Sequence, residues 1–214
     1  MSSKKVLNEE QLREWLVENK IDEVEAVVPD MAGVARGKYM PARKFSEQGG
    51  MRLPESVFIQ SVTGEYIDDY LEAGVMNPAD RDMVAKPDLD TLRLVPWGEE
   101  PTCCVIHDCY TQEDDPVDIA PRQVLRRILG MYRAQGLVPV VAPEIEFYLV
   151  KRNTDPDYPL EPPVGRSGRK ETVRQPYSMD AVDEFEPFIE DIYDYSEVQR
   201  IDVDNPAHQS GTAQ

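Results

Sequence analysis

Two glutamates inside an apolar stretch have the spacing that most clearly predicts chemistry. Glu144 and Glu146 stand in the run 140–150, where most other side chains are apolar. In a β-strand, residues two apart point to the same face with Cα atoms roughly 6.5–7 Å apart, so both carboxylates would project together while Ile145 and Phe147 pack on the other side. Such a pair of like charges favours a bound cation, and oxygen ligands favour Mg²⁺ or Mn²⁺. The alternative is an ordinary strand whose polar face meets solvent.

Two histidines are the next candidates for a site. His208 opens the polar stretch 208–214, which contains Gly211, and a histidine beside such a loop can bind a metal or move a proton. The alternative for this stretch is an unstructured tail, because chain ends usually fray. His107 lies in a stretch with strand character, where a satisfied structural histidine is the favoured interpretation.

The cysteines indicate a reducing compartment. The chain has 3 of them, Cys103, Cys104 and Cys109, an odd number whose spacing matches no zinc site. We therefore expect reduced thiols, as in a cytoplasmic protein. No apolar segment of the signal-peptide type follows Met1, and no apolar run approaches the roughly 18 residues of a membrane span, so no membrane partner is expected.

The charge balance excludes one class of partner. Lys and Arg number 23 against 41 Asp and Glu, which gives a formal net charge of −18. A chain this acidic repels phosphate backbones, so we expect no nucleic-acid binding. The acidic positions between 184 and 197 are expected to form the solvated face of a helix.

The first half of the sequence predicts a sheet with a covering helix. Asn8 and Gln11 have the spacing of a capping box before a helix over 9–19. Alternating apolar residues predict a strand over 24–28, and the turn after it leads to a returning strand over 37–40.

The middle of the chain is rich in turn-forming residues. We expect residues 46–90 to form a long excursion with little regular structure. Two further strands are predicted over 92–97 and 102–107, and a polar, linker-like stretch follows. These elements together predict a compact domain of a sheet packed on a helix.

The elements predicted after residue 120 alternate between helix and strand. Pro121 begins a helix that Gly136 ends, and an apolar strand follows over 137–150. The polar residues 151–177 should be loop, and Pro187 opens another helix. This order is typical of a second, mixed α/β domain.

Four stretches, taken in order, resemble the glutamine synthetase family over nearly the whole length of the chain. They are 34–38, 81–97, Ala142–Leu149 and 208–214. The third has the form P-E-x-E-F of the family's metal-binding strand and is the most specific. The last is similar to the start of H-E-x-x-x-x-Q-x-E.

The resemblance implies an α+β architecture: a β-grasp domain over 1–112, then the incomplete start of the catalytic α/β domain over 113–214. It implies an ATP-dependent ligase that phosphorylates the γ-carboxyl of glutamate and then lets an amine or ammonia displace phosphate. It also implies homo-oligomeric rings with active sites between subunits.

The same resemblance assigns roles to residues. Glu144 would bind one divalent ion and Glu146 the other, Mg²⁺ or Mn²⁺. Gln209 stands where the family has a metal-binding Glu, next to His208. Asp82 matches a family acid near the amine site and is the one catalytic candidate.

One departure from the family pattern concerns the nitrogen donor. Ile59 stands where ammonia-using members carry an Asp, and a site for NH₄⁺ needs such an anion. The stretches 88–97 and 175–182 look most like the branch that γ-glutamylates polyamines. We therefore expect a glutamate–amine ligase, with glutamate–ammonia ligase as the alternative.

Two other departures concern activity. Gln209 keeps a neutral oxygen but lacks the charge of Glu, which weakens a hard-cation site. The chain stops at Gln214, before the next Glu of the motif and before the family's ATP- and glutamate-binding segments. We expect an inactive fragment; the alternative is a shortened, non-catalytic member that joins a ring of longer relatives.

Overall fold

The computed structural model describes residues 8–76 and 79–214, and the contacts divide the chain into two compact units. The N-terminal unit ends at Pro139, and the C-terminal unit begins at Val140. The expectation that no signal peptide follows Met1 falls outside the described residues. Within the described ranges, no helix combines the length and the apolar character that crossing a membrane requires.

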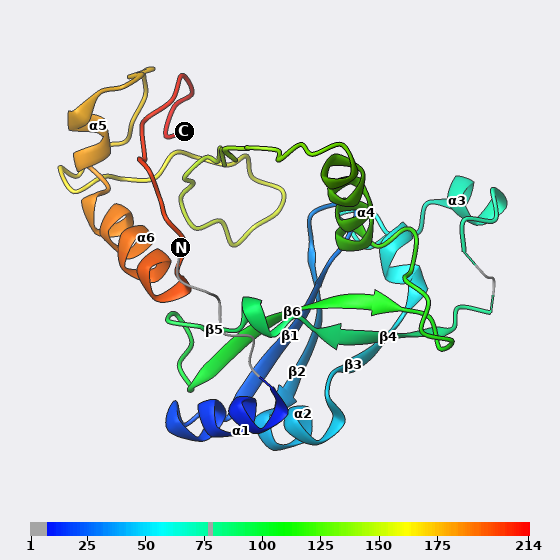
Figure 1. Cartoon of the computed structure of the whole chain (residues 1–214). Helices are drawn as coiled ribbons and strands as arrows, with labels where there is room; N and C mark the ends of the chain where they lie inside the picture. Colours follow the sequence, from blue (N-terminus) through cyan, green and yellow to red (C-terminus); the bar gives the residue numbers. More distant parts are fainter. Residues whose placement is uncertain (1–7, 77–78) are drawn as a thin grey trace. The chain divides into compact units, whose positions relative to one another are not determined.

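A mixed sheet forms the centre of the N-terminal unit (Figure 1). Its strands lie in the order β2-β1-β6-β4-β3, with β5 paired to β6. Strand β1 runs parallel to β6, and the other pairings are antiparallel. The strands are β1 (Glu23–Pro29), β2 (Ala35–Pro41), β3 (Met51–Pro54), β4 (Asp82–Pro87), β5 (Arg93–Leu94) and β6 (Thr102–Tyr110).

The first helix and the first two strands lie where short sequence patterns predict them. The capping box of Asn8 and Gln11 is formed and starts α1 (Glu9–Glu18). The predicted hairpin is confirmed as β1 and β2, and it depends on Gly37: a Cβ there would lie 1.9 Å from the carbonyl oxygen of Ala26. Only a residue without a side chain allows the two strands to approach this closely.

The expectation of little regular structure over 46–90 is wrong. This stretch holds β3, the 3₁₀ helix η1 (Glu55–Ile59), the short helix α3 (Asp68–Glu72) and β4, after the helix α2 (Ala42–Gln48). The turn-forming residues connect these short elements, and pairing with β6 stabilises β4. The strand expected over 92–97 is in fact confined to β5, whereas β6 extends beyond the predicted end at His107.

Helix α4 (Pro121–Ala134) is anchored to the sheet by paired charges. Arg122 Nε lies 2.8 Å from Asp108 Oδ1, and the same guanidinium also contacts Asp88. Arg126 contacts both carboxylates as well. These contacts explain why α4 belongs to the N-terminal unit, although the predicted domain boundary lies before it, at 112/113; that boundary stays a prediction.

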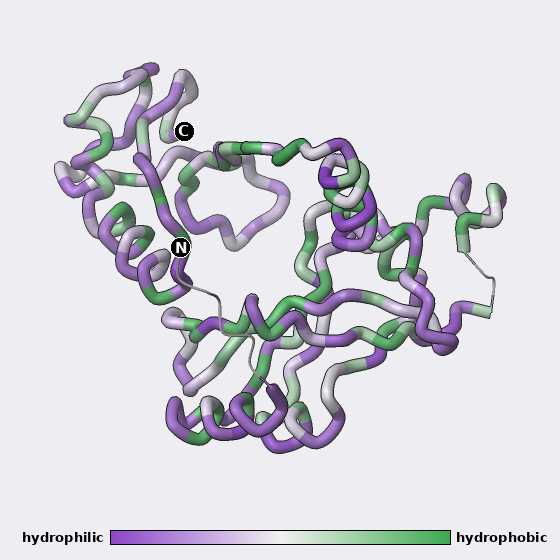
Figure 2. Tube along the Cα trace, in the orientation of Figure 1, coloured by the Kyte–Doolittle hydropathy of each residue, from purple (hydrophilic) through white to green (hydrophobic). Residues whose placement is uncertain are grey.

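The strand predicted over 137–150 is wrong. The backbone from Leu137 to Val150 belongs to no strand, and Ile145, expected to pack, is 85% exposed. Figure 2 shows hydrophobic positions along this segment. An alternating apolar pattern becomes a strand only where another strand satisfies its backbone groups. Here Leu149 N–H donates to the carbonyl of Ala213 at 2.8 Å, outside any ladder.

The rest of the C-terminal unit is loop and helix. Residues 151–177 carry no helix or strand, as expected. Helix α6 (Glu186–Gln199) confirms the predicted helix around Pro187, and the short helix α5 (Met179–Asp183) before it was not predicted. Phe188 of α6 packs edge-to-face against Phe147, with ring centroids 5.9 Å apart.

Candidate functional site

The C-terminal unit brings two of the predicted motif segments together. Gln214 Nε2 donates to Glu146 Oε2 at 3.2 Å, and the hydroxyl of Tyr148 donates to Gln214 Oε1 at 3.2 Å. The Leu149–Ala213 backbone bond runs alongside these side-chain contacts. The segment of the paired glutamates therefore lies against residues 208–214, called the C-terminal loop below.

Hydrogen bonds inside the C-terminal loop close it on itself. Gln209 N–H donates to the carbonyl of Gln214 at 3.0 Å, and Gly211 N–H donates to Gln214 Oε1 at 2.8 Å. A Cβ on Gly211 would lie 2.5 Å from ring and hydroxyl atoms of Tyr148, so a side chain there would require the Tyr148 ring to move. The loop is thus a defined turn, not the frayed tail that was the alternative.

His208 is buried at the start of this loop. Its Nε2 lies 2.9 Å from Glu171 Oε1, its Nδ1 lies 2.7 Å from the carbonyl of Gln209, and Ala213 N–H also donates to Glu171 Oε1 at 2.9 Å. Glu171 was not among the residues predicted from the sequence. It lies in a polar loop 37 positions from His208, and no short motif links the two.

The paired glutamates do not make a complete cation site with their neighbours. Glu144 and Glu146 are exposed, and Glu146 Oε2 accepts a hydrogen bond from the side-chain amide of Gln214. Among residues 8–76 and 79–214, no three His, Cys, Asp or Glu side chains form a group that could hold a metal ion. Gln209, at half-buried depth, could add only a neutral oxygen. The donor set does not satisfy a divalent ion, and no catalytic step is assigned to one.

Asp82 and Ile59 belong to the N-terminal unit. Asp82 is exposed at the start of β4, opposite Pro54 of β3. Ile59 ends η1 and is 1% exposed, so its side chain is buried and apolar.

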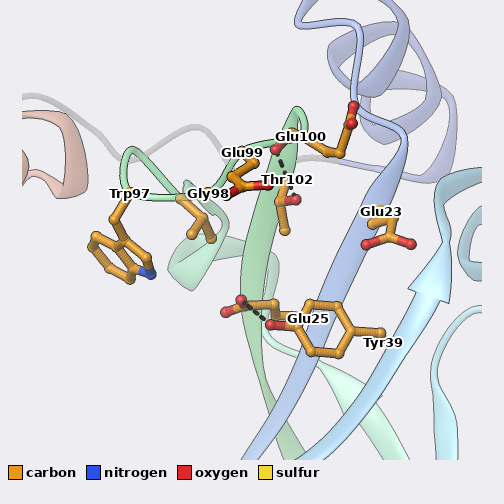
Figure 3. A pocket seen from close by; sticks show the side chains of 9 residues that line it. Glu23, Glu25, Tyr39, Trp97, Gly98, Glu99, Glu100 and Thr102 are labelled. Carbon is orange, nitrogen blue, oxygen red and sulfur yellow. Dashed lines mark hydrogen bonds between the residues drawn. The ribbon is translucent and has the colours of Figure 1, made fainter.

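A surface pocket on the N-terminal unit, also unpredicted, is lined by acids and aromatic rings (Figure 3). Tyr39 donates its hydroxyl proton to Glu25 Oε1 at 2.8 Å, which raises the pKa of the phenol. The other lining residues include Glu23, Glu99, Glu100 and Trp97. These carboxylates repel anions, so the pocket does not suit ATP or glutamate.

The buried thiols and His107 are structural. Burial raises the pKa of Cys103 and of Cys109 to about 12, and all three cysteines are free, as expected. His107 Nδ1 lies 3.1 Å from the carbonyl of Val105, and burial lowers the pKa of His107 to about 4. We expected both ring nitrogens of His107 to have hydrogen-bond partners. Only Nδ1 has one, because Nε2 has no hydrogen-bond partner among the described residues.

Comparison with known proteins identifies the family. The family model described as glutamine synthetase, catalytic domain, matches residues 118–214. The chain is 30% identical over 195 residues to γ-glutamylputrescine synthetase PuuA of Escherichia coli (strain K12), covering 89% of this chain and 40% of that protein. It is 32% identical over 156 residues to a glutamine synthetase of Methanocaldococcus jannaschii, covering 72% of this chain and 33% of that protein. The chain thus spans less than half the length of these relatives.

Solved structures show the same fold. The "GmaS/ADP complex" aligns with a TM-score of 0.62 at 18% identity, over 94% of this chain and 42% of that one. A crystal structure of a "novel glutamine synthase homolog" aligns with a TM-score of 0.65 at 14% identity, over 90% of this chain and 42% of that one. Motif order, family model, relatives and fold agree: the chain belongs to the glutamine synthetase family.

Proposed function

We propose that this chain is part of an ATP-dependent ligase that joins the γ-carboxyl of glutamate to an amine through γ-glutamyl phosphate. The observation that carries the proposal is the packing of the Glu146 segment against the C-terminal loop, because these two stretches resemble the family's metal-binding motifs. Their side chains meet although they lie far apart in the sequence.

The amine substrate is proposed to be a polyamine or another organic amine. Relatives named for amine substrates include PuuA and a glutamate–isopropylamine ligase of a Pseudomonas species, 30% identical over 142 residues, which cover 65% of this chain and 30% of that protein. The burial of Ile59 supports the same choice, since this position offers no anion to an ammonium ion. Asp82 is proposed to face the amine.

Glu144 and Glu146 are proposed as ligands of Mg²⁺ or Mn²⁺. When bound, such an ion would neutralise charge on a transferring phosphoryl group. Among the described residues the acids at 144 and 146 are too few to hold it, so further ligands are required. This chain would supply the carboxylates of Glu144 and Glu146, and the side-chain amide of Gln214 would hold that of Glu146 in place.

The remaining family features are also proposals. The domain assignments are a β-grasp domain over 1–112 and the start of the catalytic domain over 113–214; the mixed sheet and its covering helix support the first. Homo-oligomeric rings are proposed from the family alone. A cytoplasmic location is proposed from the free thiols of Cys103, Cys104 and Cys109.

Two alternatives remain testable. Glutamate–ammonia ligase is the alternative reaction, supported by relatives named glutamine synthetase. A non-catalytic role in binding or ring assembly is favoured by Gln209, where the family has a charged ligand. On the proposed function, the 214-residue polypeptide by itself does not turn over ATP, because its donor set is incomplete.

The test begins with the reading frame beyond codon 214 and continues with the purified product of that frame. We expect glutamate-dependent phosphate release from ATP with putrescine or isopropylamine and little with ammonia. Equal rates with ammonia would favour the glutamine synthetase alternative. A product that binds no Mn²⁺ and releases no phosphate with any amine would contradict the ligase assignment. Turnover by the 214-residue polypeptide would contradict its inactivity.

A further inference from the structure

The motif stretch 34–38 contains an arginine that the proposed function leaves without a role. Arg36 stands near the start of β2, and its Nε lies 2.7 Å from Oδ2 of Asp30, whose side chain is fully buried. The other oxygen, Asp30 Oδ1, accepts the backbone N–H groups of Ala32 at 2.9 Å and of Val34 at 2.8 Å. A buried carboxylate with three donors fixes its surroundings, because each lost donor would leave charge unpaired. Arg36 is therefore held firmly at the turn between β1 and β2.

The same guanidinium also reaches the segment that follows η1. Arg36 Nη2 donates to the carbonyl oxygen of Ser61 at 3.0 Å, 25 positions away in the sequence. A guanidinium presents its donors in a rigid fork, so one arginine can hold two partners at fixed angles, which the single ammonium group of a lysine cannot do. Arg36 thus connects the β1–β2 turn to Ser61.

Ser61 belongs to a small hairpin formed by residues 59–67. Its N–H donates to the carbonyl of Glu65 at 2.8 Å, and Glu65 N–H donates to Ser61 Oγ at 3.2 Å. The outer part of this hairpin exposes the carboxylate of Glu65 and the ring of Tyr66. The sequence has no Lys or Arg from 53 to 80, so no cation of this segment repels a positively charged amine. Carboxylates and aromatic rings both attract such a ligand.

We propose that Arg36 is a positioning residue for the amine substrate: it anchors the 59–67 hairpin to the β1–β2 turn, so that the hairpin is in place before the amine binds. The inference rests on the proposed function, which relates Ile59, the first residue of this hairpin, to the choice of amine. A surface that is fixed in advance loses less conformational entropy when the substrate binds. Arg36 acts through the hairpin and is assigned no contact with the amine.

The test measures amide hydrogen exchange in the 214-residue chain by NMR, and kinetics in the purified product of the reading frame that continues beyond codon 214. Arg36→Lys keeps a positive charge beside Asp30 but loses the fork, so we expect the Ser61 and Glu65 amides to exchange about tenfold faster. In the longer product the same variant should raise the KM for putrescine at least about threefold, because apparent affinity falls with the fraction of molecules whose hairpin is in place. The KM for ATP and kcat at saturating putrescine should keep their wild-type values.

The matched control is Arg43→Lys, the same substitution at an exposed arginine of α2 that pairs with Glu47. Exchange and KM should both stay at their wild-type values in it. Urea unfolding followed by tryptophan fluorescence shows whether Arg36→Lys keeps its fold. If it does not, the double variant Asp30→Asn/Arg36→Gln replaces the buried ion pair with two neutral amides and removes the guanidinium that reaches Ser61. The same two changes are expected in that variant.

Two outcomes would overturn the inference. Wild-type exchange of the Ser61 and Glu65 amides in a folded variant would show that Arg36 does not hold the hairpin. Faster exchange with an unchanged KM for putrescine would make Arg36 a structural residue only. A longer wild-type product that releases no phosphate with any amine would contradict the proposed function and the positioning role together, while the exchange data would still decide whether the anchor exists.

Discussion

Gln214 donates a side-chain hydrogen bond to Glu146 across 68 positions of sequence. The two residues come from the two motifs that resemble the family's metal-binding segments. An amide that contacts a carboxylate orients it without neutralising it, and the carboxylate keeps its other oxygen for a further ligand. This relationship makes the paired glutamates the first target for experiment.

Removing either carboxylate should weaken Mn²⁺ binding. In the purified product of the reading frame that continues beyond codon 214, we expect Glu144→Gln and Glu146→Gln each to lower the affinity for Mn²⁺ at least about tenfold, because a neutral amide replaces a charged ligand. Titration calorimetry measures it, with Glu161→Gln as the control. Wild-type affinity in both variants would show that the ion binds elsewhere.

Restoring a charge at position 209 should act in the opposite direction. We expect Gln209→Glu to raise Mn²⁺ affinity about tenfold, since a third carboxylate would join the proposed pair. The same titration measures it, and Gln175→Glu is a control for the added charge alone. Equal gains in the two variants would indicate a general effect of charge and remove Gln209 from the site.

The anchor of α4 should contribute to the stability of the N-terminal unit. We expect the double variant Arg122→Ala/Arg126→Ala to lower the free energy of unfolding by about 3 kcal/mol, because Asp108, nearly buried, then loses both of its arginine partners. Both tryptophans, Trp15 and Trp97, lie in this unit, so their fluorescence in urea reports its unfolding. Arg127→Ala removes an exposed pair with Asp118 and should cost less than about 1 kcal/mol. Equal losses would contradict the role of the buried contact.

His107 should make the stability of the same unit depend on pH. Its pKa is about 4 in the folded state, below an ordinary value of about 6.5, so the unfolded chain binds the proton more readily between these values. Stability from this residue is therefore present above pH about 6.5 and is lost as the pH falls towards about 4, by up to about 1.4 kcal/mol per pH unit.

The comparison with His107→Asn isolates this effect from the carboxylates. Asn fits a polar position but does not titrate, so the variant should lose less stability over that pH range than the wild type. Tryptophan fluorescence in urea at several pH values measures both proteins. Parallel curves would show that His107 does not contribute to the pH dependence.

An acid at position 59 should unfold the N-terminal unit and not create an ammonium site. Ile59 is fully buried, so we expect Ile59→Asp to cost several kcal/mol by placing an unpaired carboxylate in the core. Ile59→Val, which removes one methylene, should cost about 1 kcal/mol. A stable Ile59→Asp protein would mean that η1 can rearrange to expose this position.

How much could be predicted from the sequence depended on how local each signal was. The capping box at Asn8, the hairpin around Gly37 and the helix that begins at Pro121 each depend on a few neighbouring residues, and all were predicted correctly. Strands β3 and β4 were missed because their stability comes from pairing with each other and with β6.

The candidate site shows the same limit. The residue types and spacing of Glu144 and Glu146 identified the segment, but the predicted strand lacks a partner strand in this unit. Glu171 could not be found from sequence, because its role depends on a fold that brings it to His208.

The charged anchor of α4 determines where this protein can be cut. The family model begins at residue 118, yet arginines of the first helix after that point, Arg122 and Arg126, pair with Asp108 of β6 and with Asp88, which directly follows β4. In a chimera joined at residue 118, α4 would be replaced by the helix of another family member. Asp88 and Asp108 would then lose the two arginines that pair with them. Exchange of domains within this family, by recombination or by design, should therefore succeed only when α4 and the N-terminal sheet come from the same parent protein.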